Sequence, residues 1–197
     1  MTILYLDYNA TTPLRPEVQT AMTQSLSIFG NPSSLHALGR EAKESIEQAR
    51  DSIAGHLGCS PHQLIFTSGA TESNNMILKS LIWRHIKTQT KSHFITTTCE
   101  HSSITKQLPL LKDYGIEVDL IPVDAQGNIN IDTVISLIKP HTALISVMTA
   151  NNETGVVFPI EAISKIAHER GILFHTDAVQ APGKIKIGPL THTDFLT

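Results

Sequence analysis

The spacing of apolar residues along the chain predicts alternating helices and strands. Apolar side chains recur every three or four positions over residues 36–57, and residues 70–87 also predict a helix. Short β-prone runs alternate with helical stretches, at about the 30-residue length of a βαβ unit. The predicted strands cover residues 64–67, 94–97, 118–121, 143–147, 172–174 and the beginning of another at 194–197. Crossovers of this length join parallel strands, so we expect an α/β doubly wound, mostly parallel sheet with helices on both faces.

Two local features modify this pattern. Pro109 lies inside the helical stretch 102–114, where a proline removes a backbone hydrogen-bond donor and should kink or shorten the helix. The chain ends within the predicted strand 194–197, and a domain rarely ends inside a central strand because the open edge promotes aggregation. We therefore expect the sequence to be truncated.

Composition and charge exclude several classes of protein. The 15 Lys and Arg against 18 Asp and Glu give a formal charge of −3, without the basic excess that nucleic-acid binding needs. A content of 41% hydrophobic and 17% charged residues predicts a packed core rather than disorder. There is no apolar run of about 18 residues to cross a membrane, and no signal peptide at the start. Two cysteines form no disulfide framework, which favours the cytoplasm or a reducing organelle matrix.

Polar residues follow several predicted strands, at the sheet edge where open α/β proteins bind ligands. Residues 67–72 combine a small-residue turn with the start of a helix, which suits a phosphate, and the hydroxyls of Ser68 and Thr71 could add donors. An ordinary helix N-cap explains the same residues. His101 could stack on a ring, move protons or simply form structural hydrogen bonds. The polar stretch 149–155 is either a turn or a ligand-binding loop.

Asp177 follows the strand 172–174, and a buried acid is costly without a positive partner. A metal is one candidate, since His175 and Asp177 could supply two ligands, but no second pair completes the site. The other candidate is a protonated ring nitrogen, the partner that an aspartate has in pyridoxal-phosphate enzymes. This one cofactor would account for all the polar strand ends. Its phosphate would lie near Thr71 and its ring face near His101. Its phenolic oxygen would lie near Asn152 and Gln180, and its ring nitrogen near Asp177.

The same segments resemble a known family. The chain is similar to the N-terminal half of cysteine desulfurases, which belong to the class V aminotransferases among the fold-type I pyridoxal-phosphate enzymes. The similarity spans residues 3–197 and is carried by separated motifs at residues 5–13, 29–34, 66–74, 100–101, 151–156 and 175–180.

The resemblance implies a role for each matching residue. Ala70 and Thr71 would lie in the phosphate-binding turn, and His101 would stack on the cofactor ring and shuttle protons. Asp177 would pair with the ring nitrogen, and the phenolic oxygen would be contacted by Asn152 and Gln180. A histidine at the stacking position favours the desulfurase branch over general aminotransferases. No metal ligands are implied.

The implied reaction converts L-cysteine to L-alanine and passes the sulfur, as a persulfide, to an acceptor or scaffold protein, typically for iron–sulfur cluster assembly. Such enzymes are homodimers. Three alternatives stay open: a selenocysteine lyase or another class V enzyme, a non-catalytic remnant of the family, and a metal-dependent hydrolase using His175 and Asp177.

The resemblance also implies a division of the chain. Residues 1–30 would be an N-terminal segment packing near the active site, and residues 31–197 the cofactor-binding large domain. The Schiff-base lysine, the nucleophilic cysteine, the substrate-binding arginine and the small C-terminal domain would lie beyond residue 197, leaving the fragment inactive alone and marginally stable. We expect Lys184 and Lys186 on the solvent face of an extended segment at 183–187, and structural roles for Cys59 and Cys99.

Overall fold

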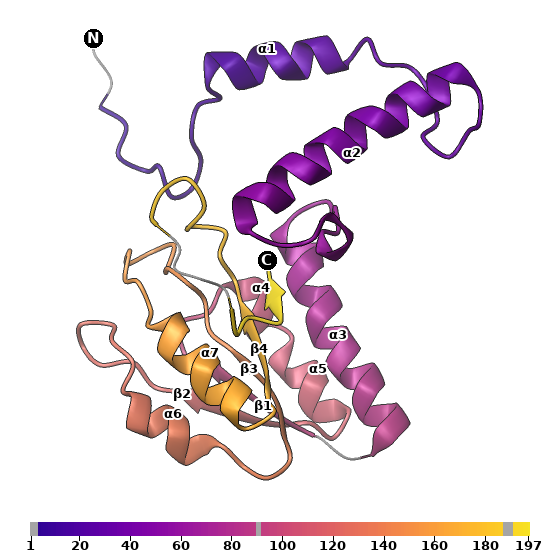
Figure 1. Cartoon of the computed structure of the whole chain (residues 1–197). Coiled ribbons are helices and arrows are strands. Elements are labelled where there is room, and N and C mark those ends of the chain that lie inside the picture. The colour runs from indigo at the N-terminus through magenta and orange to yellow at the C-terminus, as the bar shows by residue number, and fades with distance from the viewer. Residues whose placement is uncertain (1–3, 90–91, 187–190) are drawn as a thin grey trace. The chain divides into compact units, whose positions relative to one another are not determined.

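The computed structural model describes residues 4–89, 92–186 and 191–197 (Figure 1). Contacts divide the chain into two compact units, Met1–Phe66 and Thr67–Thr197. Both clusters of buried apolar side chains among the described residues lie in the second unit.

The first unit is helical. It consists of α1 (Pro16–Ser25), α2 (Ala37–Leu57) and the short 3₁₀-helix η1 (Pro61–Gln63). The helix predicted over residues 36–57 is therefore confirmed. It begins at His36, whose ring accepts a hydrogen bond from the backbone N–H of Gly39, and it ends at Gly58, which adopts a left-handed conformation with φ of +69°.

The strand predicted over residues 64–67 is wrong. None of these residues belongs to a strand of the sheet. The Arg50 guanidinium donates to the carbonyl oxygen of Leu64 and lies 4.8 Å from the centroid of the Phe66 ring. Leu64 and Phe66 thus contact a side chain of α2, and their β-prone composition does not by itself produce a strand.

The second unit contains the sheet. Its five strands are β1 (His93–Thr97), β2 (Glu117–Ile121), β3 (Thr142–Ser146), β4 (Leu173–Thr176) and β5 (Phe195–Leu196). Their order is β2-β1-β3-β4-β5 and every neighbouring pair is parallel, which confirms the doubly wound α/β prediction. The chain leaves β1 toward one edge of the sheet and then returns to build β3 on the other side of β1, which creates a topological switch point between β1 and β3.

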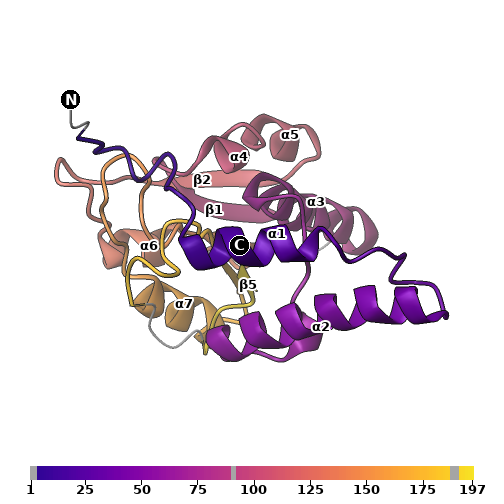
Figure 2. The ribbon, with the colours of Figure 1, turned by 90° about the horizontal axis from the view of Figure 1, so that it is seen from above.

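Helices cover both faces of this sheet, as predicted (Figure 2). One face packs against α3 (Ala70–Thr88), α4 (Ser102–Thr105) and α5 (Leu108–Asp113), and the other against α6 (Ile131–Leu137) and α7 (Ile160–Glu169). The gap between α4 and α5 confirms the effect predicted for Pro109, which lies in the first turn of α5.

Adjacent residues of the central strands serve opposite faces. Phe94 and Leu144 belong to the cluster under α3, α4 and α5, whereas Ile95 and Ile145 belong to the cluster under α6 and α7. All residues of β1 and β3 are buried. Burial on both faces explains why apolar residues stand next to each other in these strands, as Phe94 and Ile95 do, instead of alternating with polar ones.

We expect Ile145→Ala to lower the free energy of unfolding by about 2–5 kcal/mol, because it leaves a cavity at the centre of the sheet. Ile145 is 0% exposed, whereas Ile135 on α6 is 38% exposed. Ile135→Ala is the matched control, with an expected loss of about 1 kcal/mol or less. Urea unfolding followed by circular dichroism measures both losses. Equal losses for the two variants would contradict this placement of the core.

Candidate functional site

The turns that follow β1 and β3 are tied together at the switch point. The Glu100 Oε1 atom accepts hydrogen bonds from Thr97 Oγ1 at 2.9 Å and from the backbone N–H of Met148 at 3.0 Å. The Asn151 amide donates to the carbonyl oxygen of Cys99 at 2.9 Å. Segments about 50 residues apart in the sequence thus form one surface at the carboxyl ends of the strands.

The N-terminus of α3 provides backbone donors at the same edge of the sheet. No hydrogen bond within the described residues uses the N–H groups of Gly69, Ala70 and Thr71. Gly69 adopts φ of +157° and ψ of 175°, and a Cβ built on it would meet no atom within 4 Å. This open turn at a positive helix end suits an anionic group.

The donor role expected for the Ser68 hydroxyl needs a correction. This hydroxyl donates to Glu72 Oε2 at 2.6 Å, and the Ser68 backbone N–H donates to the same oxygen at 2.7 Å. These two bonds lower the pKa of Glu72, so its carboxylate is ionised and satisfies two groups at the turn. The Thr71 side chain is exposed.

Asp177 is 5% exposed, directly after β4. Its Oδ2 accepts from the Asn74 amide at 2.8 Å, and its Oδ1 accepts from the backbone N–H of Val179 at 3.1 Å. No Lys, Arg or His forms an ion pair with this carboxylate in the part of the chain that the structure describes. Because a carboxylate offers about four acceptor positions, Asp177 retains the capacity to pair with a cationic group.

Hydrogen bonds join His101 to Asp177 through two buried side chains. His101 Nδ1 lies 2.8 Å from Ser103 Oγ and accepts from the Ser103 backbone N–H at 3.2 Å. The Asn74 amide donates to Ser103 Oγ at 2.8 Å as well as to Asp177. The predicted stacking residue and the predicted partner of the ring nitrogen therefore belong to one hydrogen-bonded group.

Asn152 and Gln180 are half-buried and lie on the loops that follow β3 and β4. Asn152 lies in a turn closed by Asn151, whose Oδ1 accepts from the backbone N–H groups of Glu153 and Thr154. The stretch is therefore a turn held by Asn151, which presents the next residue at the strand end.

Gln180 Oε1 accepts from the Lys184 ammonium. The extended segment expected around Lys184 and Lys186 is wrong where it is described, because residues 182–184 form a turn closed by a bond from Lys184 N to the Ala181 carbonyl. The last residue of that expectation, Ile187, lies outside the described residues.

The arrangement around His175 does not favour a metal ligand. Its Nδ1 lies 2.8 Å from Ser146 Oγ and its Nε2 lies 3.2 Å from Thr197 Oγ1, so both ring nitrogens are engaged by hydroxyls. Burial lowers the pKa of His175 to about 3, which keeps the ring neutral. Across the described residues there is no group of three or more His, Cys, Asp or Glu side chains suited to a metal ion.

Glu100 is a second buried carboxyl group at this edge of the sheet. It is 7% exposed, and its Oε2 has no hydrogen-bond partner among the described residues. Burial raises the pKa of Glu100 to about 7, and the negative charge of Asp177 acts in the same direction. Both effects favour the neutral form of this carboxyl group.

The surroundings of Cys99 disfavour a reactive thiol. Burial is the main cause that raises the pKa of the Cys99 thiol, which disfavours the nucleophilic thiolate. This environment agrees with the structural role expected for Cys99. Cys59 follows the C-terminus of α2, where its backbone N–H donates to the carbonyl of Ala54, and a structural role for its thiol stays a prediction.

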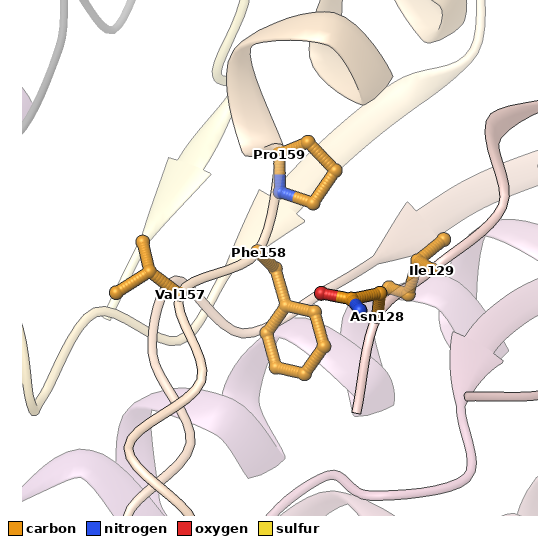
Figure 3. Close-up of a pocket in the computed structure, with 5 residues that line it drawn as sticks. All are labelled: Asn128, Ile129, Val157, Phe158 and Pro159. Carbon is orange, nitrogen blue, oxygen red and sulfur yellow. The ribbon is translucent and has the colours of Figure 1, made fainter. Parts of the chain in front are cut away.

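A separate cleft of about 270 Å³ lies between the loops that follow β2 and β3 (Figure 3). It is lined by Asn128, Ile129, Val157, Phe158 and Pro159. None of these carries a titratable side chain, and none is a predicted site residue. The cleft is therefore distinct from the group around Asp177.

Three contributors to the site were not predicted from the sequence: Asn74, Ser103 and Glu100. Asn74 offered a signal, because it precedes Ile77 and Leu78 by three and four positions and so lies on the buried face of α3. A polar residue on a buried helix face needs partners, which here are Ser103 and Asp177. Ser103 and Glu100 flank His101, and their partners come from distant segments that the sequence pattern does not reveal.

Comparison with known proteins agrees with the observed fold. The parallel sheet covered by helices matches the fold of pyridoxal-phosphate enzymes of the class V type. The profile of the family described as Aminotransferase class-V matches residues 4–196. The chain belongs to this family.

Individual relatives refine the comparison. The cysteine desulfurase IscS of Dictyoglomus turgidum is 46% identical over 185 residues, which are 93% of this chain and 46% of that protein. The structure of a NifS-like protein superposes with a TM-score of 0.89 at 37% identity, over 94% of this chain and 51% of the other. The structure of SspA in complex with cysteine gives a TM-score of 0.84 at 39% identity, over 90% and 51%. The chain thus spans about half the length of the proteins it matches.

No helix in the described ranges is long and apolar enough to cross a membrane.

We expect Glu100→Gln to remove a pH-dependent loss of stability. Because the pKa of Glu100 is raised from 4.5 to about 7 on folding, the wild-type protein should lose stability as pH rises through this window. Glutamine keeps both hydrogen bonds to Oε1 and carries no charge. The free energy of unfolding of the variant should equal that of the wild type near pH 4 and exceed it at pH 8 by at most roughly 3 kcal/mol. Unfolding of both proteins measured from pH 4 to 8 tests this, and a difference that is constant with pH would contradict it.

Proposed function

We propose that the protein containing this chain is a pyridoxal-phosphate-dependent cysteine desulfurase. In the overall reaction, L-cysteine and an enzyme thiol give L-alanine and an enzyme persulfide, from which the sulfur passes to an acceptor or scaffold protein. The observation that carries the proposal is the buried carboxylate of Asp177, which has no cationic partner in the described chain and is hydrogen-bonded through Asn74 and Ser103 toward His101. The relatives named as cysteine desulfurases support this reaction over the alternatives.

The residues present fit the cofactor. The open turn at Ala70 and Thr71 offers unpaired backbone N–H groups to the phosphate. Asp177 offers a carboxylate to a protonated ring nitrogen, and Asn152 and Gln180 would contact the phenolic oxygen. When bound, pyridoxal phosphate supplies an electron sink that stabilises negative charge beside the substrate amine.

Asp177 would keep the ring nitrogen protonated. Its carboxylate is fixed by donors on both oxygens, and moving the anion out of water is offset only if a cation pairs with it. The protein thus presents a buried negative charge at one defined position, which favours the protonated form of the ring.

His101 would stack on the ring and move protons to and from the substrate. It lies at the start of α4, where its Nδ1 is engaged by Ser103 and its side chain remains exposed toward solvent. Histidine is the side chain that most often serves as a general acid and base, which suits this role.

The proposal also covers the division of the chain, the oligomeric state and the cellular compartment. Residues 1–30 would form a segment packing near the active site, with residues 31–197 as the cofactor-binding large domain, and the complete protein would act as a homodimer. The proposed reaction needs a reduced thiol, and Cys59 and Cys99 form no disulfide. Both points favour the cytoplasm or another reducing compartment.

We expect Asp177→Ala to lower alanine formation from L-cysteine by at least roughly 100-fold, because the partner of a buried charge contributes about 3 kcal/mol or more. The assay uses the protein at the full length that its own cells make, established by intact mass, with pyridoxal phosphate and L-cysteine added. Cys59→Ala is the matched control and should keep wild-type activity. Normal alanine formation by the Asp177 variant would refute the role of Asp177.

We expect His101→Ala to slow alanine formation by roughly 10²–10⁴-fold while the cofactor stays bound, because general acid–base catalysis contributes about this much. Absorbance of the bound cofactor and alanine release are measured on the same sample. Loss of the cofactor from this variant would show that His101 serves binding rather than proton transfer.

A further inference from the structure

Asn74 lies at the centre of the candidate site and has three hydrogen-bond partners. Its side chain is 0% exposed on α3. The amide donates to Ser103 Oγ at 2.8 Å and to Asp177 Oδ2 at 2.8 Å, and its Oδ1 accepts from Thr197 Oγ1 at 2.6 Å. One buried side chain thus connects α3 with α4, with the residue after β4 and with the residue after β5.

The chemistry of these partners fixes the orientation of the amide. An ionised carboxylate only accepts hydrogen bonds, so the NH₂ group of Asn74 must face Asp177. The oxygen of the amide then faces Thr197, whose hydroxyl must donate to it. A flipped amide would set its oxygen against the Asp177 carboxylate, which is repulsive.

The same reasoning continues to His101. Because Ser103 Oγ accepts from Asn74, its own proton is free to be donated to His101 Nδ1. The Ser103 backbone N–H also points at Nδ1, at 3.2 Å, so this nitrogen must carry a lone pair rather than a proton. A neutral His101 ring therefore carries its proton on Nε2.

The hydrogen bonds on the Thr197 side of Asn74 also have defined donors and acceptors. Thr197 Oγ1 gives its proton to Asn74, so it accepts from His175 Nε2, and His175 Nδ1 then accepts from Ser146 Oγ. The neutral ring of His175 matches this pattern, since one nitrogen donates and the other accepts. Every donor in the network thus has one defined direction, and the Asn74 amide is the branch point.

We propose that Asn74 is a positioning residue that couples the two cofactor-facing groups, holding the carboxylate of Asp177 in place and, through Ser103, His101 in its Nε2–H tautomer. The meaning of this coupling for catalysis rests on the proposed function. The tautomer itself is a property of the chain and does not depend on the cofactor. Asn74 would act through Asp177 and His101 rather than by touching substrate.

The first test measures the tautomer of His101 in the cofactor-free protein. The protein at its natural length is labelled with ¹⁵N-histidine, its His101 signals are assigned with His101→Gln, and spectra are recorded at a pH where the ring is neutral. We expect the Nε2–H form in the wild type. Ser103→Ala removes one hydrogen bond of about 1 kcal/mol and should shift the tautomer ratio about fivefold toward Nδ1–H. Thr197→Val is the matched control, since it removes a different bond to Asn74, and should leave the ratio unchanged.

The second test uses the protein with bound pyridoxal phosphate and separates the contact of Asn74 with Asp177 from its contact with Ser103. The absorbance of bound pyridoxal phosphate is titrated with pH in the wild type, Ser103→Ala and Asn74→Leu. Asn74→Leu frees Asp177 and should shift the midpoint of the titration, whereas Ser103→Ala should leave it unchanged. If Asn74→Leu does not fold, Asn74→Ser, which keeps one donor, takes its place with a smaller expected shift.

The outcomes distinguish this proposal from the proposed function. A wild-type tautomer of Nδ1–H, or a ratio that Ser103→Ala does not change, overturns the coupling through Ser103. A titration midpoint that no Asn74 variant moves overturns the role toward Asp177. If the wild-type protein binds no pyridoxal phosphate, the proposed function fails, and the tautomer measurement still decides whether Ser103 orients His101.

Discussion

The candidate site depends on the burial of an anionic side chain at the end of a central strand. Asp177 lies in the interior without a cation among the described residues, and such a group is tolerated only where donors are fixed around it. Asn74 and the backbone of Val179 supply these donors. Because Asn74 comes from the helix whose first residues form the open turn at Ala70 and Thr71, the same helix positions both ends of the candidate site.

The switch point of the sheet brings the remaining groups to this carboxylate. After β1 the chain continues to β2, and after β3 it continues to β4, on the opposite side of this strand pair. The turns after β1 and β3 therefore run in opposite directions and lie next to each other where they begin. Glu100 holds them together through Thr97 and Met148. Burial and the negative charge of Asp177 both raise the pKa of Glu100, which disfavours a second negative charge in the same interior.

The two units of the chain differ in how far they bury apolar surface. The second unit packs both sheet faces, with separate clusters on each side. In the first unit, α1 has no buried residue, and Leu38, Ile46 and Ile53 on the apolar stripe of α2 are exposed in the described chain. The periodicity of α2 therefore predicted the helix correctly, while the burial that such a stripe usually indicates is limited to small residues such as Ala42 and Ala54.

The sequence by itself determined the order and type of most elements, because periodicities of two and 3.6 residues are local and each of β1 to β4 contains β-prone apolar residues. It also indicated that the candidate site lies at the carboxyl ends of the strands, since residues such as His101 and Asp177 follow those strands. Tertiary structure alone decided the pairing of Asn74 with residues 103 and 177, the raised pKa of Glu100, and the failure of residues 64–67 to form a strand. Each of these depends on burial or on contacts with side chains from other elements, and none leaves a periodic trace in the sequence.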